Sequence, residues 1–242
     1  MLGKFMNAPA PQQPAAIAAT TPDLPRSYFI ALEGWPFIVL GLLVSAVGTL
    51  LALPVLFWLG VVWVALCAAF FRNPARAIPT APGVVVSPAD GRVLSVETVD
   101  EPFFGCGPMQ RICIFLSVTN VHINRMPVAG VVQEVAYTPG RFRVAYAPEA
   151  SFENERNAIW LRSTETNDNM VLVQIAGWVA RRIICYVQRG NLVTRGMRCG
   201  LIRFGSRTDL YLPLTAHIAV RAGDRVAGGS SVLAQFVPQE TV

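Results

Sequence analysis

A Gly-Ser pair near the C-terminal end, within the stretch RFGSRTDLYLP, is the first candidate for chemistry in this chain. Gly205 has no Cβ and can adopt a strained backbone, so a hydroxyl on the next residue can approach its carbonyl group. Ser206 supplies that oxygen nucleophile, which needs a neighbouring base and hydrogen-bond donors for the oxyanion. A Gly-Ser pair is also a common turn dipeptide, so by itself it leaves an ordinary turn as the alternative.

Candidates for the base are few, because the chain has only two histidines. His122 stands in VHINR, where a structural loop histidine is the alternative to a base. His217 alternates with apolar residues in LTAHIAV, which is typical of a core or rim histidine on a strand. Asp90 stands in PADG, a sequence that is also typical of a β-turn. A carboxylate at that place could orient and charge-stabilise an imidazole.

Four motifs in a fixed order resemble the phosphatidylserine decarboxylase family in its short bacterial and archaeal form. They are FFRNP (70–74), VVSPADGRV (85–93), VHINRMPVAGVV (121–132) and RFGSRTDLYLP (203–213), behind a long apolar segment. The resemblance covers residues 70–236. It implies a proenzyme that cleaves itself between Gly205 and Ser206, so that Ser206 becomes a pyruvoyl cofactor. It also implies decarboxylation of phosphatidylserine to phosphatidylethanolamine through a Schiff base.

The same resemblance implies roles for the candidate acid and base. Asp90 matches the catalytic aspartate of the family, and His122 matches a histidine implicated in decarboxylation. Longer members carry a second histidine three residues later, where this chain has Arg125, which cannot serve as a neutral base. An Asp-His-Ser triad therefore cannot be carried over intact. Either His122 acts as base and later as acid, which we favour, or another group activates Ser206.

Two arginines are candidate substrate ligands. Arg125 could hold the substrate carboxylate or phosphate, with a solvated position or a structural salt bridge as the alternative. Arg207 stands where the usual LGST motif of the family has a small hydroxyl residue. It is either a cation near the lipid phosphate or carboxylate, or a solvated surface charge. Asp209 is interpreted as a turn or salt-bridge residue.

A long segment without charge, from Pro36 to Phe71, predicts membrane anchoring. One helical span takes about 20 residues, so the segment fits two short helices better than one long helix. Pro54 near the midpoint predicts the break, in a hairpin or a re-entrant pair. A signal peptide is the competing interpretation, but the run begins late and has no clear cleavage site. Flanking arginines place both ends on the cytoplasmic face of the inner membrane.

Beyond the apolar segment the chain changes to short β-branched runs separated by Gly and Pro, which predicts a mainly β domain. We expect a disordered tail (1–25), membrane-anchoring helices (26–72) and a hammerhead- or barrel-like catalytic domain with lipoyl-like repeats (73–242). The expected strands cover residues 84–86, 91–99, 111–116, 130–137, 158–163, 170–176, 183–187 and 210–212.

Two internal repeats support a β fold with tight glycine turns. A PxxGxVxxV pattern occurs at residues 88–96 and 127–135, and a VxxGxxVxxG pattern at residues 187–196 and 220–229. Chance repetition in a Val- and Gly-rich barrel is the alternative. Attachment of lipoate or biotin is not expected, because Lys4 is the only lysine.

The net charge and the cysteine content restrict the classes of partner and site that we expect for this chain. The net charge of +5 fits anionic lipid headgroups, and no nucleic-acid-binding motif is present. The five cysteines form no CxxC pair, so neither a disulfide framework nor a metal site is expected. We expect a membrane phospholipid as substrate, α and β chains that stay associated after cleavage, and a homo-oligomer, namely a dimer. The alternatives are a decarboxylase of a related lipid such as archaetidylserine, and a non-enzymatic membrane-tethered scaffold.

Overall fold

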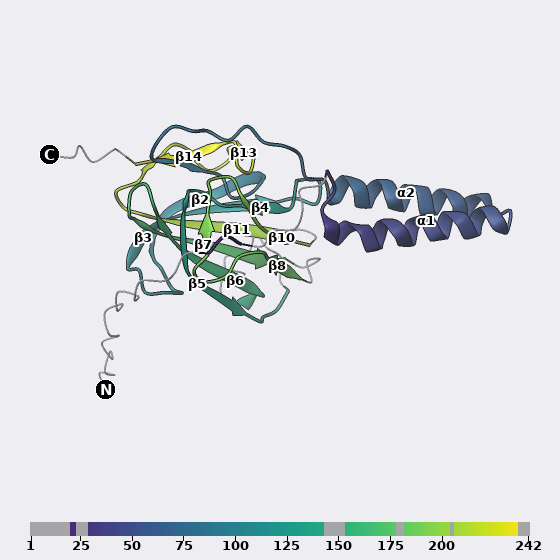
Figure 1. Cartoon of the computed structure of the whole chain (residues 1–242), viewed down its shortest axis with the longest axis horizontal. Coiled ribbons are helices and arrows are strands. Elements are labelled where there is room, and N and C mark those ends of the chain that lie inside the picture. The colour runs from purple at the N-terminus through teal and green to yellow at the C-terminus, as the bar shows by residue number, and fades with distance from the viewer. Residues whose placement is uncertain (1–19, 23–28, 143–152, 178–181, 204–205, 237–242) are drawn as a thin grey trace.

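The structure, a computed structural model, describes residues 20–22, 29–142, 153–177, 182–203 and 206–236. A helical hairpin projects from one end of a β domain (Figure 1). The predicted tail (1–25) lies outside the described residues except for positions 20–22. There, Thr20 forms a parallel bridge with Asn191 of the β domain.

The hairpin consists of two apolar helices, α1 (Trp35–Leu50) and α2 (Pro54–Phe70), after the short 3-10 helix η1 (Leu32–Gly34). Pro54 is the first residue of α2, where the missing N–H costs no helical hydrogen bond. The break predicted at Pro54 is therefore confirmed. Together, η1 and α1 are long and apolar enough to cross a membrane, whereas α2 is shorter.

Small residues let the two helices approach closely. A Cβ on Gly60 would lie 2.3 Å from the Ser45 hydroxyl oxygen and 2.6 Å from the Gly41 carbonyl oxygen. The Ser45 hydroxyl donates to the Phe57 carbonyl across the pair at 3.1 Å. Such small-residue contacts are typical of helices packed in a bilayer. The outward side is apolar and exposed at, among others, Leu40, Leu43, Leu50, Val55, Trp58, Leu59 and Leu66.

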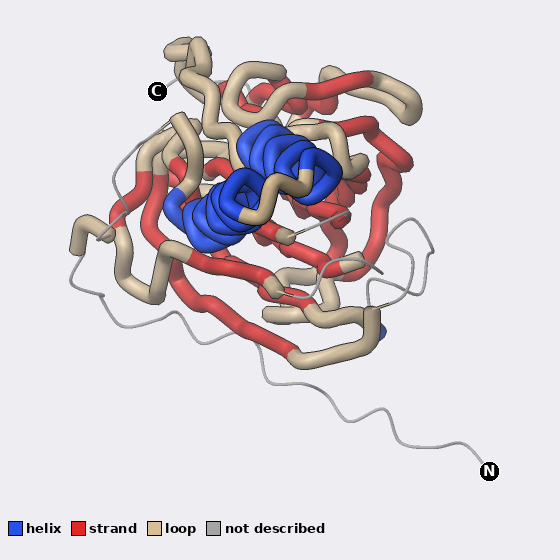
Figure 2. The backbone as a smooth tube through the Cα atoms, turned by 90° about the vertical axis from the view of Figure 1, so that its right-hand side faces the viewer, coloured by secondary structure: helices blue, strands red, loops and turns tan. Residues whose placement is uncertain are grey.

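The β domain has one large curled sheet and two small sheets. Its strands, in chain order, are β1 (Val84–Val86), β2 (Gly91–Asp100), β3 (Pro108–Leu116), β4 (Ile123–Arg125), β5 (Gly130–Thr138), β6 (Arg156–Ser163), β7 (Asn169–Ala176), β8 (Ile183–Cys185), β9 (Leu192–Val193), β10 (Arg198–Ile202), β11 (Ser206–Pro213), β12 (His217–Ile218), β13 (Arg225–Val226) and β14 (Val232–Gln235). The large sheet has the order β13-β2-β3-β11-β7-β6-β5-β9, and the small sheets are β1-β14-β12 and β4-β10-β8. Figure 2 looks along the hairpin and shows the strands curling as a half-barrel. The predicted mainly β class is confirmed.

The two faces of the large sheet bury different clusters. Leu210 and Leu212 of β11 belong to the main core, whereas Tyr211 belongs to a second cluster on the other face. Because side chains alternate along a strand, Ser206 points to the same face as Leu210, and Arg207 to the face of Tyr211.

The internal repeats correspond to matched hydrogen bonds in two units. The first unit joins residues 87–96 to 220–229, and the second joins residues 126–135 to 187–196. The Gly223 N–H donates to the Val93 carbonyl, as the Gly190 N–H does to the Val132 carbonyl, both at 2.8 Å. The Gly229 N–H likewise donates to Ser87, and the Gly196 N–H to Met126, at 2.7 and 2.8 Å. All four glycines have positive φ. The predicted glycine turns are confirmed.

Each predicted strand coincides with an observed one. The sequence analysis missed β4, β9, β10, β12, β13 and β14, which have two to five residues each. It also placed the start of β11 at Leu210, whereas the strand begins at Ser206.

Candidate active site

Ser206 opens β11, which lies between two long strands of the large sheet. It is opposite Leu116 of β3 on one side and Ala176 of β7 on the other. The side chain is fully buried, and within the described part of the chain its hydroxyl has no hydrogen-bond partner. Buried hydroxyls normally find a partner, so an orphaned one marks a site where chemistry or a ligand is expected. Gly205 lies outside the described residues.

A buried polar ladder continues from Ser206 on the same face of the sheet. The Asn124 side-chain amide donates to the Thr208 hydroxyl at 3.3 Å and accepts from the Gln174 amide at 2.9 Å. The Asn157 amide donates to the Gln174 carbonyl oxygen at 3.0 Å. This network joins β11, β7, β6 and β4 beside Ser206 and satisfies groups that would be costly to bury alone.

The sequence analysis missed most of this ladder. It assigned no role to Asn124, Thr208, Gln174 or Asn157. A signal existed in MVLVQIA (170–176), where a single glutamine interrupts an apolar run. Gly200 also belongs here, since a Cβ on it would lie 2.7 Å from the Gln174 amide nitrogen.

His122 is fully buried in the loop between β3 and β4. Its Nδ1 lies 3.0 Å from the Asn120 carbonyl oxygen. Because a carbonyl can only accept, Nδ1 carries the proton and Nε2 of the neutral ring has the basic lone pair. Burial lowers the pKa of His122 to about 4, with a smaller lowering from Arg72, while the Asn120 contact acts in the opposite direction. The ring is therefore neutral at pH 7.

Two backbone connections bring the His122 loop to the end of β11. The loop begins directly after Leu116, the residue opposite Ser206. The Ile202 N–H donates to the His122 carbonyl at 3.3 Å, and Ile202 is the last residue of β10, four positions before Ser206. The fold therefore brings His122 and Ser206 to the same end of the large sheet.

Asp90 has different partners from those expected. Its carboxylate accepts two hydrogen bonds from Arg76, at 2.7 and 2.9 Å, and one from the Gly228 N–H at 2.7 Å. These partners are Arg76, which follows the hairpin, and the backbone of Gly228. The expected orientation of the His122 imidazole by Asp90 stays a prediction.

Arg125 is held by protein oxygens rather than by a carboxylate. Its guanidinium donates to the Gly196 carbonyl at 2.9 Å, the Pro74 carbonyl at 3.1 Å and the Asn73 side chain at 3.3 Å. Burial and the nearby Arg76 lower the pKa of Arg125. The side chain is half-buried, and its role toward the substrate stays a prediction.

Arg207 is buried on the face of β11 opposite to Ser206. It forms a two-pronged ion pair with Asp209, at 2.6 and 2.7 Å, and lies 3.0 Å from the sulfur of Cys113. The pKa of Arg207 is raised, since the attraction of Asp209 outweighs the desolvation that comes with burial. The solvated alternative is wrong for Arg207, and the interpretation of Asp209 as a salt-bridge residue is confirmed.

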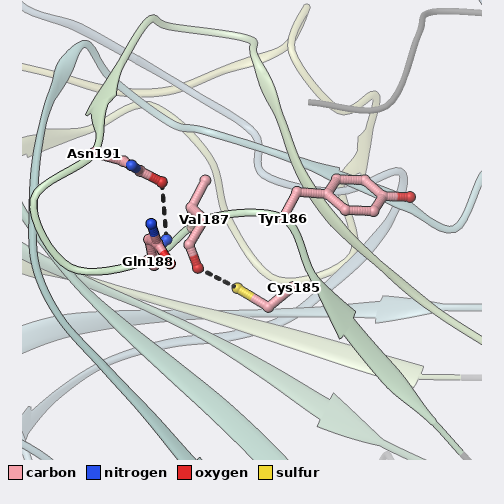
Figure 3. A pocket seen from close by; sticks show the side chains of 5 residues that line it. All are labelled: Cys185, Tyr186, Val187, Gln188 and Asn191. Atoms are coloured by element: carbon pink, nitrogen blue, oxygen red, sulfur yellow. Dashed lines mark hydrogen bonds between the residues drawn. The ribbon is translucent and has the colours of Figure 1, made fainter. Parts of the chain in front are cut away.

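The other sequence candidates lie away from this site. His217 is exposed on β12, so a core position is excluded for it. Among the described residues, no group of three or more His, Cys, Asp or Glu side chains could hold a metal ion. A pocket of about 200 Å³ is lined by Cys185, Tyr186, Val187, Gln188 and Asn191 (Figure 3). It contains none of the predicted site residues. Two hydrogen bonds join its lining residues within the turn, and Tyr186 and Asn191 also bond to Glu33 and Thr20 outside it.

Comparisons with known proteins agree with this geometry. The family model described as phosphatidylserine decarboxylase matches residues 63–234. Proteins called "Phosphatidylserine decarboxylase proenzyme" from Nitrosomonas europaea and Burkholderia pseudomallei are 45% and 48% identical to this chain. The first alignment covers 90% of this chain and 99% of the relative, and the second covers 87% and 96%. A similarly named protein from Ralstonia pickettii is 47% identical over 86% of this chain and 95% of its own length.

Proposed function

The chain belongs to the phosphatidylserine decarboxylase family, and from this premise we propose how its own residues make the pyruvoyl group and use it. Proenzymes of this family form that group from a serine, and the enzyme decarboxylates phosphatidylserine. In this chain we assign the serine to Ser206. The observation that carries the assignment is its buried hydroxyl, which has no hydrogen-bond partner among the described residues.

Maturation begins when the Ser206 hydroxyl attacks the Gly205 carbonyl, which moves the peptide bond from nitrogen to oxygen. β-Elimination then breaks the bond between Cβ and the ester oxygen, which releases residues 1–205 with a terminal carboxylate. The dehydroalanine left at position 206 takes up water and loses ammonia, which gives the ketone. When formed, the pyruvoyl group supplies a carbonyl that condenses with the substrate amine and accepts the electrons released with carbon dioxide.

His122 is the proposed proton carrier in both stages. A neutral imidazole can take the Ser206 proton during maturation, and in each turnover it can take a proton from the substrate ammonium group and return it to the substrate carbon. Its low pKa keeps the ring in the basic form at pH 7. Asp90 stays a candidate for maturation, but its contacts with Arg76 and the Gly228 N–H support an indirect, positioning role.

The two arginines receive different proposed roles. Arg125 lies beside Asp90 and Arg76, and it is retained as a candidate for the substrate phosphate or carboxylate. Arg207 is assigned to anchoring β11, because its guanidinium is occupied by Asp209 on the face opposite to Ser206. This ion pair would keep the new N-terminus at position 206 fixed after cleavage.

The sheet order supports continued association of the two chains. The α chain (206–242) would keep β11 between β3 and β7, and its remaining described strands pair with β1 and β2 or with one another. Separation would break this central pairing. The three predicted segments (1–25, 26–72, 73–242), the lipoyl-like character of the repeat units and the homodimer stay predictions.

The hairpin is proposed to anchor the enzyme in the cytoplasmic leaflet of the inner membrane. Its helices are about 24 Å long, which is shorter than the hydrocarbon core of about 30 Å. Both helices meet the β domain at the same end (Figure 1). The catalytic domain would then lie against the surface from which the lipid substrate comes.

Three variants test the proposal. Ser206→Ala is expected to abolish both chain splitting and release of carbon dioxide from phosphatidylserine, measured by gel electrophoresis and a radiolabelled-carboxyl assay. Asp90→Asn should leave most of the chain unsplit, and His122→Ala should slow both stages. A Ser206→Ala protein that still splits and turns over would refute the assignment.

A further inference from the structure

The segment that joins the hairpin to the β domain contacts the catalytic loop on both sides of His122. This segment is the FFRNP motif, residues 70–74, and we call it the clasp. Its residues at positions 70 and 71 belong to the same buried cluster as Val121 and Ile123, the neighbours of His122 in the chain. Strands β4 and β10 of one small sheet, which lie near the base of the hairpin (Figure 1), contribute residues to this cluster.

Phe70 is the part of the clasp that touches the imidazole. Its ring centroid lies 4.3 Å from that of His122, with an angle of 32° between the rings. Phe70 is the last residue of α2 and is itself buried. The last residue of the hairpin therefore packs on the imidazole of His122, the proposed proton carrier.

Arg72 fixes the loop before His122. Its guanidinium donates to the Thr119 carbonyl at 2.7 Å and to the Ala69 carbonyl at 2.6 Å. The second contact satisfies a carbonyl in the last turn of α2, where a cation is also favourable. One side chain thus ties the end of the helix to the loop that supplies the Asn120 carbonyl for His122.

The clasp also holds the residues after His122. The Arg125 guanidinium donates to the Asn73 side chain and the Pro74 carbonyl, at 3.3 and 3.1 Å. Four of the five clasp residues, Phe70, Arg72, Asn73 and Pro74, therefore contact Thr119, His122 or Arg125 of the catalytic loop.

We propose that Phe70 and Arg72 are positioning residues that hold His122 in its reactive orientation, so that the membrane hairpin forms part of the active-site wall. The inference rests on the proposed role of His122. An aromatic ring stacked on the imidazole restricts its rotation and excludes water. Loss of the ring would let water solvate the imidazolium, which disfavours the neutral base.

The test compares Phe70→Leu with Phe57→Leu, the same substitution near the other end of α2. Decarboxylation is measured in phosphatidylserine–detergent micelles, where membrane partition does not limit the rate, and flotation with vesicles is measured in parallel. Phe70→Leu should lower kcat by between about 10- and 100-fold with little change in KM. The acid limb of the pH–rate profile of Phe70→Leu should move to higher pH. Phe57→Leu should keep the wild-type kcat and pH profile. Phe70→Tyr should restore most of the rate.

Arg72→Gln provides a second arm in case Phe70→Leu does not fold. It removes the Thr119 contact and a positive charge that lowers the pKa of His122. We expect a smaller loss of kcat and again an acid limb at higher pH, with partial rescue by Arg72→Lys. If both variants keep the wild-type kcat and pH profile while His122→Ala is inactive, the clasp is refuted and the proposed function stands. If His122→Ala is fully active, the role of His122 itself fails.

Discussion

The two repeat units share one backbone but differ in side-chain chemistry. Their glycine turns make equivalent hydrogen bonds to equivalent strands. At the PADG turn, however, the first unit has Asp90 where the second has Ala129, and Asp90 binds Arg76. His122, which lies just before the second unit, corresponds to Gly83 before the first. The residues that repeat hold the sheet, and those that differ supply the proposed chemistry.

The largest loss of stability is expected from substitutions at the glycines where each unit brings two backbones close together. A Cβ on Gly91 would lie 2.2 Å from the Phe115 carbonyl oxygen, and one on Gly130 would lie 2.4 Å from that of Arg162. Neither carbonyl can move without breaking strand pairing, so Gly91→Ala and Gly130→Ala should each destabilise by about 3 kcal/mol. Chemical denaturation in detergent checks this. Tolerance of one substitution but not the other would break the equivalence of the units.

The buried histidine, His122, predicts a pH dependence of stability. Burial lowers the folded-state pKa of His122 to about 4 from 6.5, so the unfolded chain binds its proton first as the pH falls. The free energy of unfolding should therefore decrease by about 2 kcal/mol between about pH 7 and pH 5 on account of this residue. His122→Gln should remove that part of the slope. A slope that is the same in His122→Gln as in the wild type would contradict this prediction.

One residue of each unit forms a short ion pair with a residue outside the unit, and only one of these two pairs is expected to matter for maturation. Arg76 pairs with Asp90, and Arg195 pairs with Glu165 through two contacts of 2.6 Å. Arg76→Gln and Arg195→Gln should each cost about 1 kcal/mol, because both pairs are partly exposed. Only Arg76→Gln should also slow chain splitting, followed by pulse-chase labelling. Equal splitting rates in the two variants would assign Asp90 a purely structural role.

The smallest effect concerns the outer glycine turns. Gly190 and Gly223 have φ values of 87° and 98°, which side chains other than glycine rarely adopt. Gly190→Ala and Gly223→Ala should each lower the free energy of unfolding by about 1 kcal/mol. Thermal melts of the two variants should agree closely, and a clear difference would show that only one turn supports the sheet.

Local patterns predicted the framework well, because alternation and glycine turns are local properties. The hairpin, its break at Pro54 and the long strands were all foreseen. The start of β11 was missed, because Arg207 and Asp209 look like loop residues until the sheet buries them as a pair. Short strands such as β4 and β10 were missed because two to five residues carry too little pattern.

The sequence supplied candidate site residues but not their contacts. The motifs identified Ser206, His122 and Asp90, but partners distant in the chain decide what each one touches. Arg76 takes the Asp90 carboxylate, and Phe70, inside an apolar run that predicts only a membrane helix, lies on His122. These contacts depend on how the hairpin packs on the β domain. Local sequence patterns carry no information about that packing.

The most direct test of the central claim is the intact mass of the purified, active enzyme. The account predicts two fragments, residues 1–205 and 206–242, with the smaller one lighter by one ammonia than a serine-terminated peptide. Borohydride should reduce its ketone and abolish activity. An active enzyme that is unsplit, or whose smaller fragment begins with intact serine, would contradict the account.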